Sequence, residues 1–157
     1  MAIRERSTAV ALDDVSKAII EQLQQDGRRP YATIGKAVGL SEAAVRQRVQ
    51  KLTDAGVMQI VAVTDPMQLG FYRQAMIGIR ASGDARVIAD QLAEHPSVEY
   101  LVLTAGSFDI LVEVVCEDDS QLIDVLHSEI RQLDGVVSTE TFVYLELKKQ
   151  QYNWGTR

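Results

Sequence analysis

The sequence predicts an α+β protein with an N-terminal helix-turn-helix (winged-helix-like) domain and a C-terminal ferredoxin-like βαββαβ domain. Two patterns carry this prediction. Apolar residues recur at helical spacing through residues 12–56, and from residue 75 onward the order is strand, helix, strand, strand, helix, strand. A length of 157 residues accommodates two small domains. We expect the first domain at 1–63, a linker at 64–73 and the second domain at 74–157.

The first helix is expected within "LDDVSKAIIEQLQQDG". Asp13 can cap its start, because a short acidic side chain accepts hydrogen bonds from the first free backbone N–H groups. Val15, Ile19 and Leu23 recur every four residues and share one face. Gly27 is expected to end the helix in a left-handed turn.

The second helix, "YATIGKAV", places Ile34, Ala37 and Val38 on one face. Gly35 inside it costs about 1 kcal/mol relative to alanine, so this helix depends on tertiary packing. Gly39 then turns the chain.

The third helix is expected to begin after Ser41 as its cap, to run to about Ala55 and to stop at Gly56. At 100° per residue its apolar positions fall in one narrow sector, and its polar positions lie opposite or on the flanks. The apolar positions are Val45, Val49 and Leu52, and the others are Ala43, Gln47, Gln50, Arg46 and Lys51.

Three short helices with a glycine-containing turn before the last one match a helix-turn-helix. The second helix of such a motif reads base edges in the major groove, while nearby cations hold phosphates. A solvated surface helix shows the same pattern, and both interpretations are open at this point. Candidate phosphate contacts are Arg28, Arg29, Arg46, Arg48 and Lys51, candidate base contacts are Gln47, Ala43 and Gln50, and Ser41 and Glu42 complete the candidate DNA-binding set. Arg48 leans toward the core side and can instead fix the domain internally.

The net charge of −6 hides an asymmetry. Residues 1–60 carry nine Lys and Arg against seven Asp and Glu, whereas residues 61–157 carry seven against fifteen. Because salt screens exposed charges beyond about 8–10 Å, local charge governs docking. Composition therefore permits DNA binding by the first domain only.

The second half begins with "VMQIVAVTD", which alternates like a strand, followed by a connector around Pro66 and "LGFYRQ". The expected strands are "AMIGIRA", "VEYLVLT", "FDILVEVV" and "VVSTETFVYLEL", and the expected helices are "DARVIADQLAEH" and "DSQLIDVLHSEIRQL". Asp119 or Ser120 is expected to cap the last helix. Its sheet-facing residues are expected to be Leu122, Ile123, Leu126, Ile130 and Leu133.

Several classes of protein are disfavoured. No apolar run reaches the roughly 20 residues of a membrane span, and "MAIRERSTAVALDD" lacks a signal-peptide core. Cys116 is the only cysteine and lies in the apolar run "ILVEVVC", so we expect strand packing rather than chemistry. Neither His95 nor His127 has a second metal-binding residue at ligand spacing, and no nucleophile-base motif is present. We expect no enzyme activity, catalytic residue, metal or cofactor.

The chain resembles the Lrp/AsnC (feast/famine) family of transcription regulators over about residues 12–150. The resemblance lies in "DGRRPYATIGKAVGLSEAAVRQRVQKLTDAGV", "TAGSFDILVEV" and "VVSTETFVYLEL". It implies dimers joined through the ferredoxin-like domains, often assembled to tetramers or octamers, with amino-acid or related effectors bound between subunits. The chain has Pro30-Tyr31 where many members place a polar cap, and Ser107 where an acidic residue is common.

The turn between the two middle strands is a candidate effector site. Gly106 lets the backbone approach a ligand, whose carboxylate can take exposed N–H groups, and Asp109 can accept from an ammonium group. An ordinary hairpin, with Asp109 satisfying local N–H groups, is the competing interpretation. The candidate residues are Thr104, Ala105, Gly106, Ser107 and Asp109, with Thr139 and Thr141 on the last strand facing either a cleft or solvent.

The last strand carries apolar groups on both sides, with Val143, Leu145 and Leu147 alternating with Phe142 and Tyr144. We therefore expect at least a homodimer. The expected function is sequence-specific binding of double-stranded DNA, modulated by an amino acid or related metabolite, in the cytoplasm and associated with the nucleoid. The alternative is an architectural DNA-wrapping protein that ignores small molecules.

Overall fold

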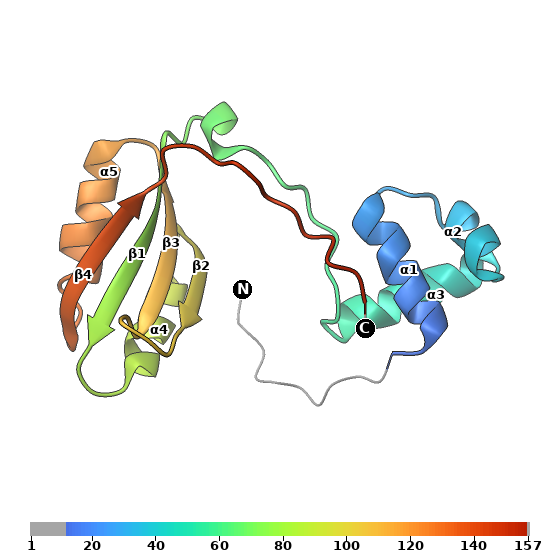
Figure 1. Ribbon diagram of the computed structural model, residues 1–157, viewed down its shortest axis with the longest axis horizontal. Helices are drawn as coiled ribbons and strands as arrows, with labels where there is room; N and C mark the ends of the chain where they lie inside the picture. Colours follow the sequence, from blue (N-terminus) through green and yellow to red (C-terminus); the bar gives the residue numbers. More distant parts are fainter. Residues whose placement is uncertain (1–11, 157) are drawn as a thin grey trace. The chain divides into compact units, whose positions relative to one another are not determined.

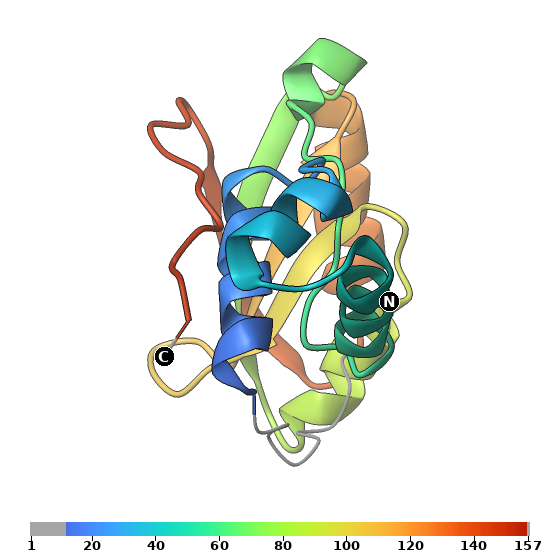
Figure 2. The ribbon, with the colours of Figure 1, turned by 90° about the vertical axis from the view of Figure 1, so that its right-hand side faces the viewer.

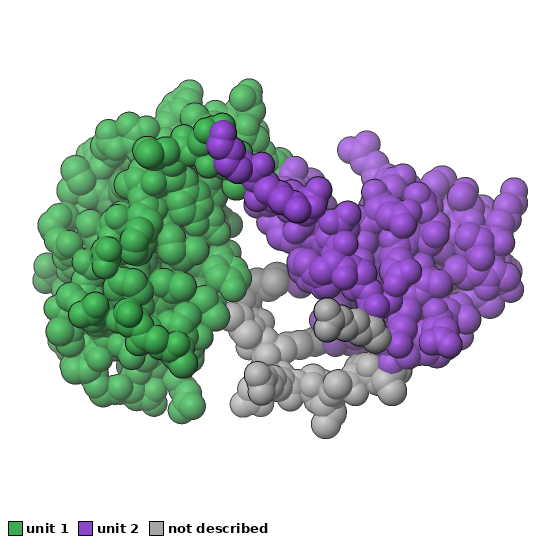
Figure 3. Space-filling model, in the orientation of Figure 1, with its two compact units in different colours: residues 1–2, 64–147 green, residues 3–63, 148–157 purple. Residues whose placement is uncertain are grey.

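The computed structural model describes residues 12–156, which form two compact units (Figure 3). One comprises residues 64–147, and the other comprises the helices before residue 64 together with the chain after residue 147. The sequence pattern placed this C-terminal tail in the second domain. In the structure the backbone N–H of Gly155 donates to Gln24 Oε1 at 3.1 Å, and Thr156 Oγ1 donates to Glu21 Oε1 at 2.5 Å. The prediction that residues 1–14 lack a signal-peptide core falls mostly on residues 1–11, which lie outside the described residues.

Helix α1 spans Asp14–Gln25 (Figure 1). The predicted cap is confirmed, because an Asp13 carboxylate oxygen accepts from the Ser16 N–H at 2.7 Å. The predicted stop is wrong: Asp26, in an extended conformation, caps the helix, and Gly27 is not among the residues with positive φ. The helix ends before Gly27, so no left-handed residue is needed there.

Helix α2 spans Tyr31–Val38 and ends at Gly39, whose φ of 73° confirms the predicted turn. Ile34 is fully buried, but Ala37 is exposed, so its predicted place on the apolar face is wrong. Gly35 is buried, and a β-carbon there would lie 2.5 Å from the Leu40 carbonyl oxygen. The close approach of α2 to the turn at residues 39–41 therefore requires a glycine at position 35, although glycine is a poor helix former.

Helix α3 spans Glu42–Asp54, with Ser41 Oγ accepting from the Ala44 N–H and Gly56 at a φ of 68° beyond its end. Both predicted boundaries are confirmed. Val45 and Val49 pack with Ile19, Leu23 and Ile34 in one core. Figure 2 shows the three helices (blue to teal) from the side.

The predicted strand at residues 57–65 is wrong, because this segment is irregular in the structure. Its apolar side chains at Ile60, Val61 and Val63 are about half or more exposed. Within the described residues no strand pairs with it, and an isolated strand cannot satisfy its backbone groups. The chain continues through a 3-10 helix at Pro66–Leu69, capped by Asp65.

Four strands form one antiparallel sheet in the order β2-β3-β1-β4. The strands are β1 Arg73–Ala81, β2 Val98–Leu103, β3 Ile110–Cys116 and β4 Val136–Val143. This order and the βαββαβ sequence confirm the predicted ferredoxin-like fold. The last strand is shorter than predicted: Leu145 beyond it is 96% exposed.

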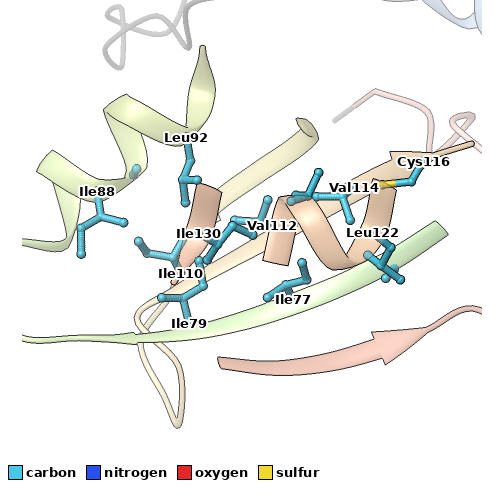
Figure 4. Packing of buried hydrophobic residues seen from close by; sticks show 13 residues of the cluster. Ile77, Ile79, Ile88, Leu92, Ile110, Val112, Val114, Cys116, Leu122 and Ile130 are labelled. Atoms are coloured by element: carbon cyan, nitrogen blue, oxygen red, sulfur yellow. The ribbon is translucent and has the colours of Figure 1, made fainter. Parts of the chain in front are cut away.

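The sheet and two helices enclose one hydrophobic core (Figure 4). The helices are α4 (Ala85–Ala93) and α5 (Asp119–Asp124), and a π-helix at Val125–Ile130 continues α5. Ile77 and Ile79 from β1 pack with Ile88, Leu122 and Ile130. Cys116 is buried in the same core, as predicted, and burial raises the pKa of its thiol.

Two expectations for the last helix are wrong. Asp118 caps it, accepting from the Gln121 N–H at 2.9 Å, in place of Asp119 or Ser120. Ile123 is exposed, and Val125 is buried in its place. The wide π-turns after Asp124 shift the side chains away from the 3.6-residue period used for the prediction. No helix among residues 12–156 is long and apolar enough to cross a membrane.

Candidate nucleic-acid interface and candidate effector turn

One face of α3 is open along its whole length. Val45, Val49 and Leu52 point into the core and leave the opposite side chains outside. Exposed on this helix and its cap are Ser41, Glu42, Ala43, Arg46, Gln47, Gln50 and Lys51. Eight of the ten sequence-predicted DNA-binding residues thus lie on α3 and its cap, and all of these except the half-buried Arg48 are exposed.

Gln47 and Lys51 are the least engaged of these residues. Within residues 12–156 neither side chain forms a hydrogen bond or an ion pair, and both border a surface hollow between α3 and the start of α1. Gln50 differs, because its Nε2 donates to Asp54 Oδ1 at 2.8 Å. A free amide and a free ammonium group can meet an incoming partner without breaking an internal contact.

Arg46 is held by two neighbours. Its Nη2 donates to Glu42 Oε1 at 2.8 Å, and its guanidinium carbon lies 5.3 Å from the centroid of the Tyr31 ring. Both contacts are at the surface, where each contributes about 0.5–1 kcal/mol at most. They orient the guanidinium more than they stabilise the fold.

Arg48 has an internal role. Its Nη1 donates to both carboxylate oxygens of Asp13, at 2.7 and 3.0 Å, and to Ser16 Oγ at 3.0 Å. Hydrogen bonding by Ser16 and then by Arg48 lowers the pKa of Asp13 to about 2. The pair joins the N-cap of α1 to α3, which is the alternative that the sequence had left open for Arg48.

Arg28 and Arg29 occupy the loop before α2. Arg28 is exposed, and its backbone N–H is held by Asp26 Oδ1 at 2.9 Å. Arg29 Nη1 donates to Gln22 Oε1 and, at 3.4 Å, to Gln25 Oε1. Arg28 is therefore the better placed of the two for an external contact.

The turn between β2 and β3 exposes backbone donors. Within residues 12–156 the N–H groups of Ala105, Gly106 and Ser107 make no hydrogen bond, and all three residues are exposed. Thr104 Oγ1 donates to the Phe108 carbonyl at 2.6 Å, and the Thr104 N–H donates to the Asp109 carbonyl at 2.9 Å. The turn is thus fixed at its base, and at its tip Arg80 Nε donates to the Ser107 carbonyl at 2.9 Å while the three N–H groups stay unbonded among the described residues.

Asp109 is held through both its side chain and its backbone. Its Oδ2 accepts from the Ala81 N–H at 2.8 Å, and its own N–H donates to the Ile79 carbonyl at 2.9 Å. These contacts tie the turn to the end of β1 and match the hairpin interpretation. The other carboxylate oxygen, Oδ1, accepts no hydrogen bond from residues 12–156.

Thr139 and Thr141 do not lie beside the candidate effector turn. They pair with Ile79 and Ile77, so they share the side of the sheet that the helices cover. Thr139 Oγ1 accepts from Arg131 Nε at 2.9 Å. Both threonines are half-buried rather than open to a cleft.

Phe108 is a residue that the sequence reasoning missed. A β-carbon on Gly78 would lie 2.7 Å from its ring, so the ring lies directly on β1, on the face away from the helices. Its ring meets Phe142 edge to face at 6.2 Å, and the Arg80 guanidinium carbon lies 5.6 Å from its centroid. Gly78 and Phe108 are thirty residues apart in the chain, so no local sequence pattern predicts this contact.

Within residues 64–147 no helix or strand covers this second face of the sheet. Alternate residues of the strands place Met76, Leu111 and Phe142 there, the Phe108 ring joins them over Gly78, and Phe142 is 44% exposed. Tyr144 lies at its edge, where burial and the carboxylate of Glu113 raise the pKa of the phenol to about 12. A sheet with helices on one side only leaves such a face to a partner.

Comparison with known proteins identifies both halves. A family described as the AsnC-type helix-turn-helix domain matches residues 12–53, and one described as a C-terminal dimeric alpha+beta barrel domain of AsnC regulators matches residues 71–157. An uncharacterized HTH-type transcriptional regulator of Pyrococcus horikoshii is 32% identical over 148 residues, covering 93% of this chain and 94% of the relative. The HTH-type transcriptional regulator LrpA of the same organism is 30% identical over 140 residues, covering 88% and 99%.

Solved structures are similar over the same length. AsnC of E. coli is 27% identical, with a TM-score of 0.78 over 91% of this chain and 98% of that chain. A transcriptional regulator from Neisseria meningitidis, crystallised in complex with L-Met, is 24% identical and also has a TM-score of 0.78, over 91% and 96%. The likeness to the Neisseria protein shows a shared fold.

Proposed function

This chain belongs to the Lrp/AsnC family of transcriptional regulators, and we propose on that premise that its DNA binding is sequence-specific and is modulated by an amino acid or a related small metabolite. The observation that carries the first part is the open face of α3. It presents an unengaged amide at Gln47 and an unengaged ammonium group at Lys51, on a helix whose other side is buried.

The residues on this face have different roles. Gln47 can donate and accept at the edge of an adenine, and Ala43 is small enough to let the helix approach the bases. Lys51 and Arg28 hold phosphates, whereas Arg48 stabilises the domain through Asp13. Ser41 and Gln50 are engaged locally, as helix cap and with Asp54, so we assign them weaker contributions.

The candidate effector site is the tip of the turn after β2. A zwitterionic amino acid needs donors for its carboxylate and an acceptor for its ammonium group. The unbonded N–H groups of residues 105–107 supply the donors, and Oδ1 of Asp109 supplies the acceptor within a few residues. Thr139 and Thr141 lie on the other face of the sheet, and we assign them no contact within the same chain.

Assembly completes the proposal. The C-terminal domain is of a dimeric type, and the uncovered face with Met76 and Phe142 is the surface for the partner subunit. Further association to tetramers or octamers, and a cytoplasmic location on the nucleoid, are parts of the same proposal. Effectors bound near subunit contacts can then change assembly and, through it, DNA affinity.

The test combines ligand screening with DNA binding. The full chain is screened by thermal shift against the free amino acids, including L-methionine, the ligand of the Neisseria protein with this fold. Each ligand that raises the melting temperature is then added to a titration of the protein's own upstream DNA, followed by fluorescence anisotropy.

We expect one amino acid or close relative to change the DNA affinity, and the DNA to change the affinity for that ligand by the same factor, because coupling is reciprocal. DNA binding that no ligand alters would identify the architectural alternative. An upstream DNA bound no better than random DNA would contradict sequence-specific regulation.

A further inference from the structure

Arg46 is held in one orientation on the open face of α3. Glu42 accepts a hydrogen bond from one of its nitrogens, and the guanidinium carbon lies over the ring of Tyr31, the first residue of α2. The Arg46 side chain is nevertheless 66% exposed. The donors that do not contact Glu42 therefore face outward on a planar group, which loses little freedom when it binds.

The position of Glu42 argues against a phosphate as the ligand of Arg46. Its side chain is 52% exposed and lies one turn before Arg46 on the same face, with a carboxylate oxygen 2.8 Å from the guanidinium. A phosphate bound there would be repelled by Glu42, and Arg46 would reach it with its charge already paired. Lys51 and Arg28, without such a partner among the described residues, are the better phosphate ligands.

A base pair fits both side chains. In the major groove guanine presents O6 and N7, which a planar guanidinium contacts with two hydrogen bonds, and the paired cytosine presents the N4 amino group, which a carboxylate accepts. Residues four apart on a helix are neighbours. The guanine acceptors and the cytosine amino group are likewise neighbours on the edge of one base pair. A glutamate beside an arginine is thus complementary to G·C, and it disfavours a base pair that presents no amino group to the carboxylate.

We infer that Glu42 and Arg46 together read one G·C base pair in each half-site, and that Tyr31 is the positioning residue that holds Arg46 for this contact. The inference rests on the proposed sequence-specific DNA binding and refines it. Arg46 thereby becomes a base contact in place of the phosphate contact that the sequence suggested. Tyr31, which follows Pro30 where many family members place a polar helix cap, positions Arg46.

The test uses a half-site selected from random DNA with the full chain, in which every position is then replaced in turn by the other three base pairs. The parent is expected to prefer G·C at one position by about 5- to 150-fold, the range for a good two-bond contact. Arg46→Lys keeps the charge but not the planar group. It should abolish that preference while leaving both the affinity for random DNA and the salt dependence unchanged.

Three further variants separate reading from positioning. Glu42→Gln should weaken the preference at the same position. Tyr31→Leu should weaken it too, whereas Tyr31→Phe, which keeps the ring, should restore it. Circular dichroism melting confirms that each variant is folded, since Tyr31 also packs against the core of the helices. Arg86→Ala, a change at an exposed position of α4, should leave this position unaltered.

A phosphate contact would give a different set of results. Arg46→Lys would then leave every base preference unchanged, and Arg46→Ala would weaken all sequences alike and reduce the salt slope by about one. That outcome overturns the inference and leaves the proposed function intact. A parent protein that selects no sequence from random DNA would overturn both.

Discussion

Gly35 shows at the residue scale how a local cost is offset by a long-range contact. A β-carbon there would lie 2.5 Å from the Leu40 carbonyl oxygen, which belongs to the backbone of the turn and cannot rotate away. We predict that Gly35→Ala lowers the free energy of unfolding by about 1–3 kcal/mol, although alanine is the better helix former. Urea unfolding of the full chain measures this.

Gly27→Ala is the matched control for that experiment. A β-carbon at Gly27 would meet its nearest neighbour at 3.8 Å, an ordinary contact, and its φ is not positive. Its stability should therefore stay within about 0.5 kcal/mol of the parent or rise slightly. Equal effects of the two substitutions would show that the helix–turn contact is not tight.

Asp109 combines a structural bond with a proposed ligand contact. We predict that Asp109→Ala lowers the free energy of unfolding by about 1–3 kcal/mol, because the Ala81 N–H loses its acceptor, and also weakens the effector about ten- to a hundredfold. Urea unfolding and calorimetric titration measure the two effects. Asp90→Ala, at an exposed position of α4, is the control. Unchanged ligand affinity beside lowered stability would leave Asp109 as a hairpin residue only.

Local chemistry made some site residues predictable. The caps at Asp13 and Ser41 and the open side of α3 follow from short-range rules, and they are confirmed. The ring of Phe108 on Gly78 depends on a turn and a strand brought together from thirty residues apart in the chain, and no local pattern encodes it. The same holds for Tyr31 beneath Arg46.

At the scale of elements, the helices and the sheet order follow from periodicity and turn residues. The predictions that are wrong concern segments whose structure depends on contacts with the rest of the fold. Residues 57–65 alternate like a strand but have no pairing partner among the described residues, and they remain irregular. The π-helix at Val125–Ile130 breaks the period on which the sheet-facing residues of the last helix were assigned, and Val125 is buried where Ile123 was expected to be.

The contact between α1 and α3 makes the helical domain sensitive to acid. Because the folded-state pKa of Asp13 is lowered from 3.8 to about 2, its contribution to stability is complete above the unfolded-state pKa and is lost as the pH falls through about 2. We predict that Asp13→Asn, which keeps a helix cap, loses less stability than the parent between pH 5 and pH 2. Urea unfolding across this range measures the difference. Parallel curves for the two proteins would contradict the pairing with Ser16 and Arg48.

At the scale of the whole molecule, the uncovered face of the sheet predicts an obligate dimer. Phe142 contacts Phe108 on this face and remains 44% exposed in the single chain. We predict that the parent has at least twice the 17.4 kDa of one chain at micromolar concentration, and that Phe142→Asp shifts it toward the monomer. Light scattering measures both.

Val87→Asp is the control for assembly, because Val87 is an exposed apolar residue on α4, in the helical layer rather than on the uncovered face. It should leave the dimer intact. A folded monomer of 17.4 kDa in the parent would show that this sheet face is stable in water without a partner.

The charge asymmetry also belongs to this scale. The excess of acidic residues lies after residue 60, so the half that carries α3 has no net negative charge to repel DNA. Salt dependence of DNA binding should therefore report contacts of the helical domain rather than the total charge of −6.

The most direct test of α3 as the DNA-binding surface is a salt series of binding titrations on the selected site and on random DNA, with the parent, Gln47→Ala, Lys51→Ala and Arg86→Ala. Gln47→Ala should weaken the selected site by about 1–3 kcal/mol and leave random DNA nearly unchanged. Lys51→Ala should weaken both and reduce the salt slope by about one, while Arg86→Ala, which removes the same charge from α4, should match the parent. If Gln47→Ala and Lys51→Ala both bind as the parent does at every salt concentration, the open face of α3 is not the surface that meets DNA.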